Sequence, residues 1–320
     1  MPNDQGVHPR HGGITDTFSQ TTGGRMGRHL VRHPVRHLVR RVVSLLAVAA
    51  LLTLVVAAPA LADDPVGSRD CQLGTNKCID AVVKEMTRRF DPLAKACDHD
   101  AIFSLAYLRV TQAYRQAVED PQYFSDNALV NHEDALFASL YFTADSNYRA
   151  GLRGQVPQAW QIAFDAAEHR QVSGAGNMLL GMNAHITRDL PIVLDQIGLG
   201  SKADYDKIND LTAPLYGPTL DEIARRFDPS VRQLSGGDVP GTSLDDDLVI
   251  QTGIAYREDA WQKAEQLHSA TTPAARALVL AEIESDAATR AQALLTTYGY
   301  KPGESSAPRD AFCATHWNSP

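Results

Sequence analysis

The sequence lacks the short motifs that identify several large enzyme classes. It has no phosphate-binding Gly-x-x-x-x-Gly-Lys-Ser/Thr loop and no Gly-x-Ser-x-Gly turn that would present a catalytic serine. Gly174, Gly176 and Gly181 follow no strand-like segment, so they do not form a dinucleotide-binding fingerprint. We expect their small size to permit close helix packing instead. The sequence therefore does not favour a P-loop enzyme, a serine hydrolase or a dinucleotide-dependent enzyme.

Patterns typical of β-strands are also missing. After residue 62, no stretch of useful length alternates apolar and polar residues, whereas apolar residues recur at helical spacing almost continuously. We see no internal repeat and no linker between domains. The pattern predicts an all-α fold, a single multi-helix bundle domain over residues 63–320. Within it, a helix over 78–90 should stop at Asp91-Pro92, and Pro214 and Pro218 should break or kink a later one.

Basic residues are scarce in this predicted domain. Residues 63–320 contain 23 Lys and Arg against 36 Asp and Glu, a net charge of −13. Stable nucleic-acid binding needs Lys and Arg to neutralise phosphates, so this balance argues against it. A phosphoester substrate in a metal-lined pocket is not excluded by the same argument.

Charge is absent from residues 42–58, which read VVSLLAVAALLTLVVAA. An Arg- and His-rich segment precedes this run, and Ala60 and Ala62 follow it as in a signal-peptidase site. We interpret residues 1–62 as a secretory signal peptide, with Met26 as an alternative start. The remaining chain would be secreted or extracytoplasmic, with no membrane span after cleavage. The alternative is a retained N-terminal anchor.

Cysteine is rare, with four residues that all follow residue 62. No Cys-x-x-Cys pair exists, so a four-cysteine zinc site is not expected. An even number in an exported chain predicts two disulfides, for which three connectivities are possible. We favour Cys71–Cys78, which closes a short loop, and Cys97–Cys313, which ties the C-terminal tail to the early helices.

Candidate chemistry centres on the apolar stretch GNMLLGMNAHITRDLP, residues 176–191. His185 and Asp189 are four residues apart and share a helical face, as do Asp165 and His169 in the preceding segment. The connection between the two segments is short, so the helices should pack against each other. Two imidazoles and two carboxylates could then bind a divalent metal such as Zn or Mn.

Such a metal would activate a bound water for hydrolysis of a phosphoester or another small ester. Glu168 could act as general base and Asn183 could orient the substrate. A further contribution could come from His132, Glu133 and Asp134, although three consecutive polar residues more often form a solvated face.

Structural roles are alternatives for each of these residues. Asp189 precedes Pro191 and could cap the following helix, and His169 could be a last-turn cation. Asn183, His185 and Asp189 could instead form a buried polar network that fixes helix register. The protein would then be a non-enzymatic module that binds a small apolar molecule or a cell-envelope component.

Most of residues 63–320 resemble an uncharacterised bacterial family, domain of unknown function 5995. The resemblance rests on AWQIAFDAAEHRQVSGAGNMLLGMNAHITRDLPIVL, on upstream SLAYLRVTQAY and LFASLYFTAD, and on downstream AYREDAWQKAEQL. Its most specific part is Gly-x-Asn-Ala-His-Ile-x-x-Asp-Leu-Pro, residues 181–191. The resemblance implies a helical fold and no established activity.

A second, local resemblance involves the His-x-x-x-Asp pair followed by Pro. It is similar to a helix of zinc-dependent phospholipase C and of single-strand-specific zinc nucleases, and it implies metal-ligand roles for His185 and Asp189. Those families carry another metal-binding His shortly after the Pro, whereas this chain has IVLDQ there. A full three-metal cluster is therefore not expected.

Overall fold

The computed structural model describes residues 64–234 and 244–320. The predicted signal peptide, its alternative start and its cleavage site lie outside these residues. Within them, no helix is long and apolar enough to cross a membrane.

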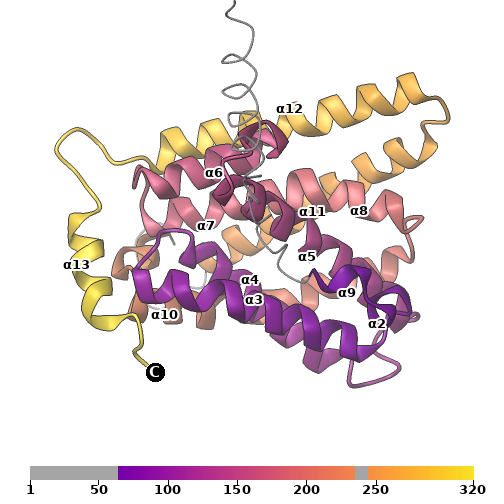
Figure 1. The fold of residues 1–320 in the computed structure, drawn as a ribbon, viewed down its shortest axis with the longest axis horizontal. Coiled ribbons are helices and arrows are strands. Elements are labelled where there is room, and N and C mark those ends of the chain that lie inside the picture. Colours follow the sequence, from indigo (N-terminus) through magenta and orange to yellow (C-terminus); the bar gives the residue numbers. More distant parts are fainter. Residues whose placement is uncertain (1–63, 235–243) are drawn as a thin grey trace, which may run out of the picture. The chain divides into compact units, whose positions relative to one another are not determined.

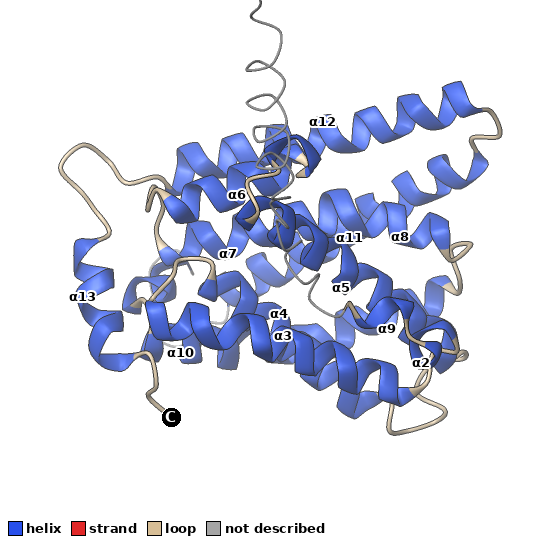
Figure 2. Cartoon of the chain, in the orientation of Figure 1, coloured by secondary structure: helices blue, strands red, loops and turns tan. Residues whose placement is uncertain are grey.

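The described residues confirm the all-α prediction (Figures 1 and 2). No strand occurs among them, and Val172 and Gly299 form an isolated antiparallel bridge. The elements are η1 (Pro65–Gly67), α2 (Arg69–Gln72), α3 (Asn76–Ala96), α4 (Ala101–Ala117), α5 (Asn127–Arg149), η2 (Arg153–Gln155), α6 (Gln158–Glu168), α7 (Gly174–Asn183), η3 (Ala184–Asp189), α8 (Leu190–Gln196), α9 (Lys202–Thr212), η4 (Ala213–Leu215), α10 (Tyr216–Arg226), η5 (Pro229–Leu234), α11 (Leu244–Ser269), α12 (Pro273–Tyr298) and α13 (Ala307–His316).

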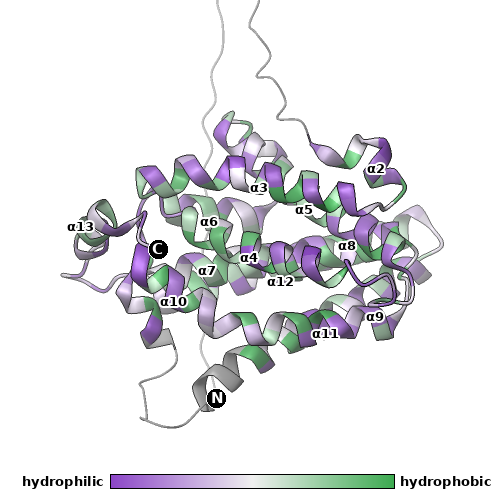
Figure 3. Cartoon of the chain, turned by 90° about the horizontal axis from the view of Figure 1, so that it is seen from below, coloured by the Kyte–Doolittle hydropathy of each residue, from purple (hydrophilic) through white to green (hydrophobic). Residues whose placement is uncertain are grey.

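Helix α4 lies inside the bundle. Its neighbours include α3, α7, α9 and α10, and Figure 3 shows it enclosed between α3 and the helices on the opposite side. Buried side chains occur on several faces of α4, among them Ile102, Leu105 and Leu108. The first two turns of α4 carry apolar residues on several faces, which explains why this part of the helix lies in the core.

Both predicted disulfides are present. Cys71–Cys78 joins α2 to the start of α3, and Cys97–Cys313 joins the end of α3 to α13. Helix α13 also packs against α10 (Figure 1). The second disulfide therefore attaches the C-terminal helix to the early part of the bundle.

Two prolines behave differently. The expected helix end at Asp91-Pro92 is wrong, because α3 continues through Pro92 to Ala96. Phe90 and Leu93 are buried on either side of it, so tertiary packing offsets the backbone hydrogen bond that proline removes. Pro214 does break the helical ladder, since α9 ends at Thr212 and η4 precedes α10.

Helices α7 and α8 are joined without a loop by η3, which is a π-helical segment. Pro191 follows it and has no backbone N–H, so it cannot donate the hydrogen bond of a regular α-helical ladder, and π segments arise at such interruptions. Close packing supports this region, because a Cβ at Gly181 would lie 2.3 Å from Cγ of Phe103 in α4. The expected role of glycine in close helix packing is confirmed at this position.

Candidate functional site

The four predicted metal ligands fall into two separate groups. Among the residues that the structure describes, Asp165 and His169 belong to a set of three possible ligands completed by Glu168. His185 and Asp189 are not part of that set and lie in η3. Helices α6 and α7 do pack together as expected, but the structure does not bring the four donors to one point.

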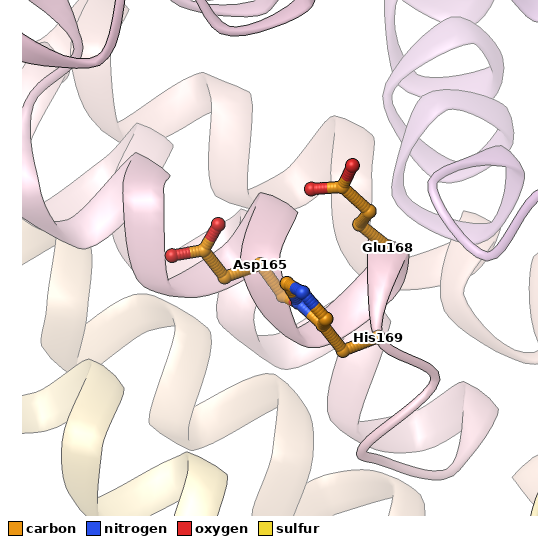
Figure 4. A group of neighbouring side chains, drawn as sticks. All are labelled: Asp165, Glu168 and His169. Carbon is orange, nitrogen blue, oxygen red and sulfur yellow. The ribbon is translucent and has the colours of Figure 1, made fainter.

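The first group lies at the C-terminal end of α6 (Figure 4), where Asp165 is half-buried and Glu168 and His169 are exposed. Its three possible ligand atoms lie within 4.8 Å of one another. Both carboxylates already have a neighbouring donor, because Tyr148 Oη lies 2.7 Å from an Asp165 oxygen and 2.6 Å from a Glu168 oxygen, and its single O–H can bond to either. Arg153 also pairs with both acids. A metal here would have to compete with an existing guanidinium.

The predicted general base belongs to the same surface group. Hydrogen bonds from Tyr148 and then from Arg153 lower the pKa of Glu168. A carboxylate with a lowered pKa is a weaker base, and Glu168 is exposed on α6. His169 is the C-cap residue of α6, and its Nδ1 lies 2.8 Å from the Asp165 carbonyl oxygen.

The second group is a buried network. His185 Nδ1 lies 3.2 Å from Asp189 Oδ2, and the two side chains are 3 % and 0 % exposed. Trp160 Nε1 donates to the same carboxylate oxygen at 2.8 Å. Arg188 donates to Asp189 Oδ1 at 2.9 Å and also pairs with Glu284 of α12. The carboxylate of Asp189 therefore holds three side chains in place.

Two structural alternatives for this segment need correction. Asp189 is the N-cap residue of α8, but its side chain makes no capping hydrogen bond, because it turns toward the network instead. Among the residues that the structure describes, Asn183 makes no hydrogen bond with His185 or Asp189. It donates to the Ala287 carbonyl oxygen of α12 at 2.8 Å, so it attaches η3 and α7 to a different helix.

The imidazole of His185 has a fixed orientation. It stacks on Phe137 with ring centroids 3.5 Å apart and meets the edge of Tyr107 at 4.4 Å. A carboxylate accepts hydrogen bonds, so Asp189 requires the proton on Nδ1 and leaves Nε2 as an acceptor. Burial lowers the pKa of His185, although Asp189 acts in the opposite direction. Nε2 is buried and has no partner within the described protein.

His185 lines a partly open cavity of about 210 Å³. The cavity is lined by residues of α4, α5, α7, η3, α8, α9, η4, α10 and α11. Most of its wall is apolar, with Phe103, Phe137, Met182 and Ile254 as examples. Gly253 of α11 also faces it, and a Cβ at that position would meet no atom within 4 Å. An engineered apolar cavity of about 150 Å³ admits benzene, so this cavity has room for a small organic molecule.

Two adjacent acids of α5, Glu133 and Asp134, line the same cavity. Residues 132–134 are half-buried and do not form a fully solvated face, and His132 hydrogen bonds through Nδ1 to the Cys71 carbonyl oxygen at 2.9 Å. Burial raises the pKa of Glu133 to about 7, opposed by Arg257. Burial, reinforced by Glu133, raises the pKa of Asp134 to about 7.

Polar atoms without a protein partner gather at this cavity. Tyr107 Oη, Asp134 Oδ2 and His185 Nε2 are buried and form no hydrogen bond within the described protein. Arg257 contributes an unpartnered Nε, while its Nη2 donates to the Tyr205 carbonyl oxygen. More than 90 % of buried polar groups in native proteins are hydrogen bonded, so this cluster is a feature that needs a chemical explanation.

Asp134 is among the candidates named from the sequence but Tyr107 is not, although a signal for both exists. Phe103, Tyr107 and Val110 follow one another at spacings of four and three in α4, and Val130, Asp134 and Phe137 do so in α5. An acid inside an apolar helical stripe indicates a buried carboxyl. Arg257 has no comparable signal, because the charged residues Glu258 and Asp259 follow it directly in the sequence.

The comparisons with known proteins identify one family. The family model described as a family of unknown function, DUF5995, matches residues 79–297. Every residue that lines the cavity lies within this matched range. No curated protein and no solved structure matches the chain. The local resemblance to zinc phospholipases and nucleases therefore has no support from these comparisons.

Proposed function

Since the chain belongs to this family of unknown function, DUF5995, we propose a function from the geometry of its cavity. The proposal is that the protein is a ligand-binding module, which holds one small, mainly apolar molecule inside the bundle. A polar head on that molecule would contact Tyr107, Asp134 and His185. Of the two functions expected from the sequence, this is the non-enzymatic one.

The observation that carries the proposal is the convergence of unpartnered polar atoms on one apolar cavity. Leaving a buried polar group without a partner costs about 1–3 kcal/mol. Three such atoms belong to residues of α4, α5 and η3 that line the same cavity. Ligand pockets combine an apolar lining with a few convergent polar groups, and a bound molecule would satisfy all three atoms together.

Metal-dependent hydrolysis has weaker support. The donors proposed for it lie in two groups, one paired with Arg153 and one saturated by Trp160 and Arg188. Zn and Mn therefore remain cofactor proposals for the surface group alone. Secretion also stays a proposal, with which the two disulfides are compatible.

The test uses a substitution that fills the cavity without disturbing its walls. In a Gly253→Phe variant the new ring enters open space, so the variant should fold and lose binding. We expect 2-phenylethanol to bind the wild-type protein at one site in a calorimetric titration, and to raise its melting temperature as any ligand of the native state does. The matched control is Gly154→Phe at an exposed position with equal space.

Saturable binding that Gly253→Phe abolishes and Gly154→Phe retains supports the proposal. Absence of binding to the wild type, or equal binding in the Gly253→Phe variant, overturns it. A melting temperature close to wild type shows that each variant is folded.

A further inference from the structure

The polar atoms at the cavity are mainly acceptors. Asp134 offers Oδ2, and Glu133 offers a second carboxyl from the next position of α5. His185 offers Nε2, because Asp189 fixes the proton on the other ring nitrogen. Tyr107 Oη can donate or accept. A head group that matches this set must carry several donors, and an ammonium group has three donors and no acceptor.

The charges of the cavity wall also favour a positively charged head group. Arg257 is the one basic residue among those that line it. Its guanidinium lies 4.1 Å from the Tyr205 ring centroid. Its positive charge acts to lower the pKa of Glu133. The charge that acts on Asp134 is the like charge of Glu133. With both acids ionised, the described wall therefore has one negative charge in excess.

Aromatic rings complete a site for a cation. Tyr107, Phe137 and Tyr114 line the cavity beside the two acids. A cation near the face of an aromatic ring gains electrostatic attraction, and more of it where water is excluded. The same rings would contact the apolar body of a ligand.

On the basis of the ligand-binding function proposed above, we propose that the ligand is an apolar amine, bound as its ammonium ion between Asp134 and His185. Asp134 Oδ2, His185 Nε2 and Tyr107 Oη accept its three N–H groups. No covalent bond forms. The amine enters carrying its proton, and a protonated Asp134 releases its own proton to solvent as the ion pair forms.

This proton balance makes binding dependent on pH. The titratable and charged groups that line the cavity around Asp134 are Glu133 of α5, Tyr107 and Tyr114 of α4, His185 of η3, Tyr216 of α10 and Arg257 of α11. Burial raises the pKa of the Tyr107 and Tyr114 hydroxyls, so both stay neutral between pH 5 and 8, and burial lowers the pKa of the His185 imidazole, which favours its neutral form. The two acids therefore dominate the change, and amine affinity should rise as they ionise.

The experiment compares three probes that share one apolar body: 2-phenylethylamine, 2-phenylethanol and 3-phenylpropionate. At pH 8 the wild-type protein should bind the amine at least about tenfold more tightly than the alcohol, and the carboxylate more weakly still, because charge-assisted hydrogen bonds are stronger than neutral ones. Near pH 6, titrations in two buffers of different ionisation enthalpy should show net proton release with the amine and none with the alcohol.

The Asp134→Asn variant keeps the shape and removes the charge, so it should lose the preference for the amine while still binding the alcohol. Asp210→Asn, at an exposed position of α9, should match wild type. Equal affinity for amine and alcohol, or a preference for the carboxylate, overturns the amine assignment and leaves the cavity function standing. If none of the probes binds the wild type, the ligand-binding function itself fails with it.

Discussion

His185 Nδ1 and Asp189 Oδ2 lie 3.2 Å apart inside a π-helical turn, and Trp160 donates to the same carboxylate oxygen. The carboxylate fixes the tautomer of the buried imidazole, because it requires the proton on Nδ1. One edge is fixed by the carboxylate, and the other nitrogen remains at the cavity wall as an acceptor. A structural network and a binding group are therefore parts of one arrangement.

Asp189→Asn should lower the free energy of unfolding by about 2–4 kcal/mol, because the change leaves the buried His185 and Arg188 with an impaired partner. Urea unfolding followed by circular dichroism measures this. Asp210→Asn removes an exposed carboxylate and should change stability by less than about 0.5 kcal/mol. If the Asp189→Asn variant is as stable as wild type, the hydrogen-bond network around Asp189 does not stabilise the protein.

His185→Ala separates the network from a metal site. The substitution removes a ring packed against Phe137 and Tyr107, so the melting temperature should fall by on the order of 5–10 °C. The decrease should be equal with chelator and with added Zn or Mn. His169→Ala at the exposed end of α6 serves as control. A decrease that disappears in chelator would support a metal at His185 instead.

Two glycines should respond in opposite directions to alanine. Gly181→Ala places a methyl group against the ring of Phe103 and should destabilise the protein by about 1–3 kcal/mol. Gly253→Ala enters open space in the middle of α11 and should stabilise it by up to about 1 kcal/mol, because alanine is the better helix former. Parallel urea unfolding of the two variants tests both, and equal signs would be inconsistent with the packing described.

Removing the Cys97–Cys313 disulfide by a double substitution to alanine should cost about 5 kcal/mol in the chain-entropy model, since it closes a loop of 216 residues. The Cys71–Cys78 bond closes a loop of 7 residues and should contribute about 2 kcal/mol. Thermal unfolding of the two double variants gives the comparison. A larger loss at the short loop would show that strain or local packing dominates.

The buried acids should make stability depend on pH. The pKa of Asp134 is about 7 in the folded protein and ordinarily 3.8, so the folded state retains a proton that the unfolded chain releases between these values. The stability from this group is present below about pH 4 and is lost as pH rises toward 7. His99, whose pKa burial lowers to about 4, acts in the opposite direction over a similar range.

The contribution of Asp134 is therefore isolated by difference. The free energy of unfolding of Asp134→Asn, relative to wild type, should rise between pH 4 and pH 7, while His99 contributes equally to both proteins. If the difference in the free energy of unfolding between the two proteins does not change with pH, the pKa of Asp134 is not raised.

The sequence by itself determined the helical fold and the close packing at Gly181, because these depend on periodicity and side-chain size, which are local properties. It predicted two disulfides but left three pairings possible, and the tertiary structure selects the favoured one. The sequence also brought His185 and Asp189 together, because residues four apart on a helix share a face.

Only the tertiary structure decided where the acids of the chain lie. Asp165 and Glu168 were expected to converge with His185, yet Tyr148 and Arg153 hold them at the surface. For Glu133 and Asp134 a solvated face was the favoured expectation, yet both are half-buried and line a cavity together with residues of α4, η3 and α11. The charge state of a carboxyl depends on its neighbours in space, and those come from helices far apart in the chain. For the same reason, a cavity assembled from nine elements leaves no signature in any one of them.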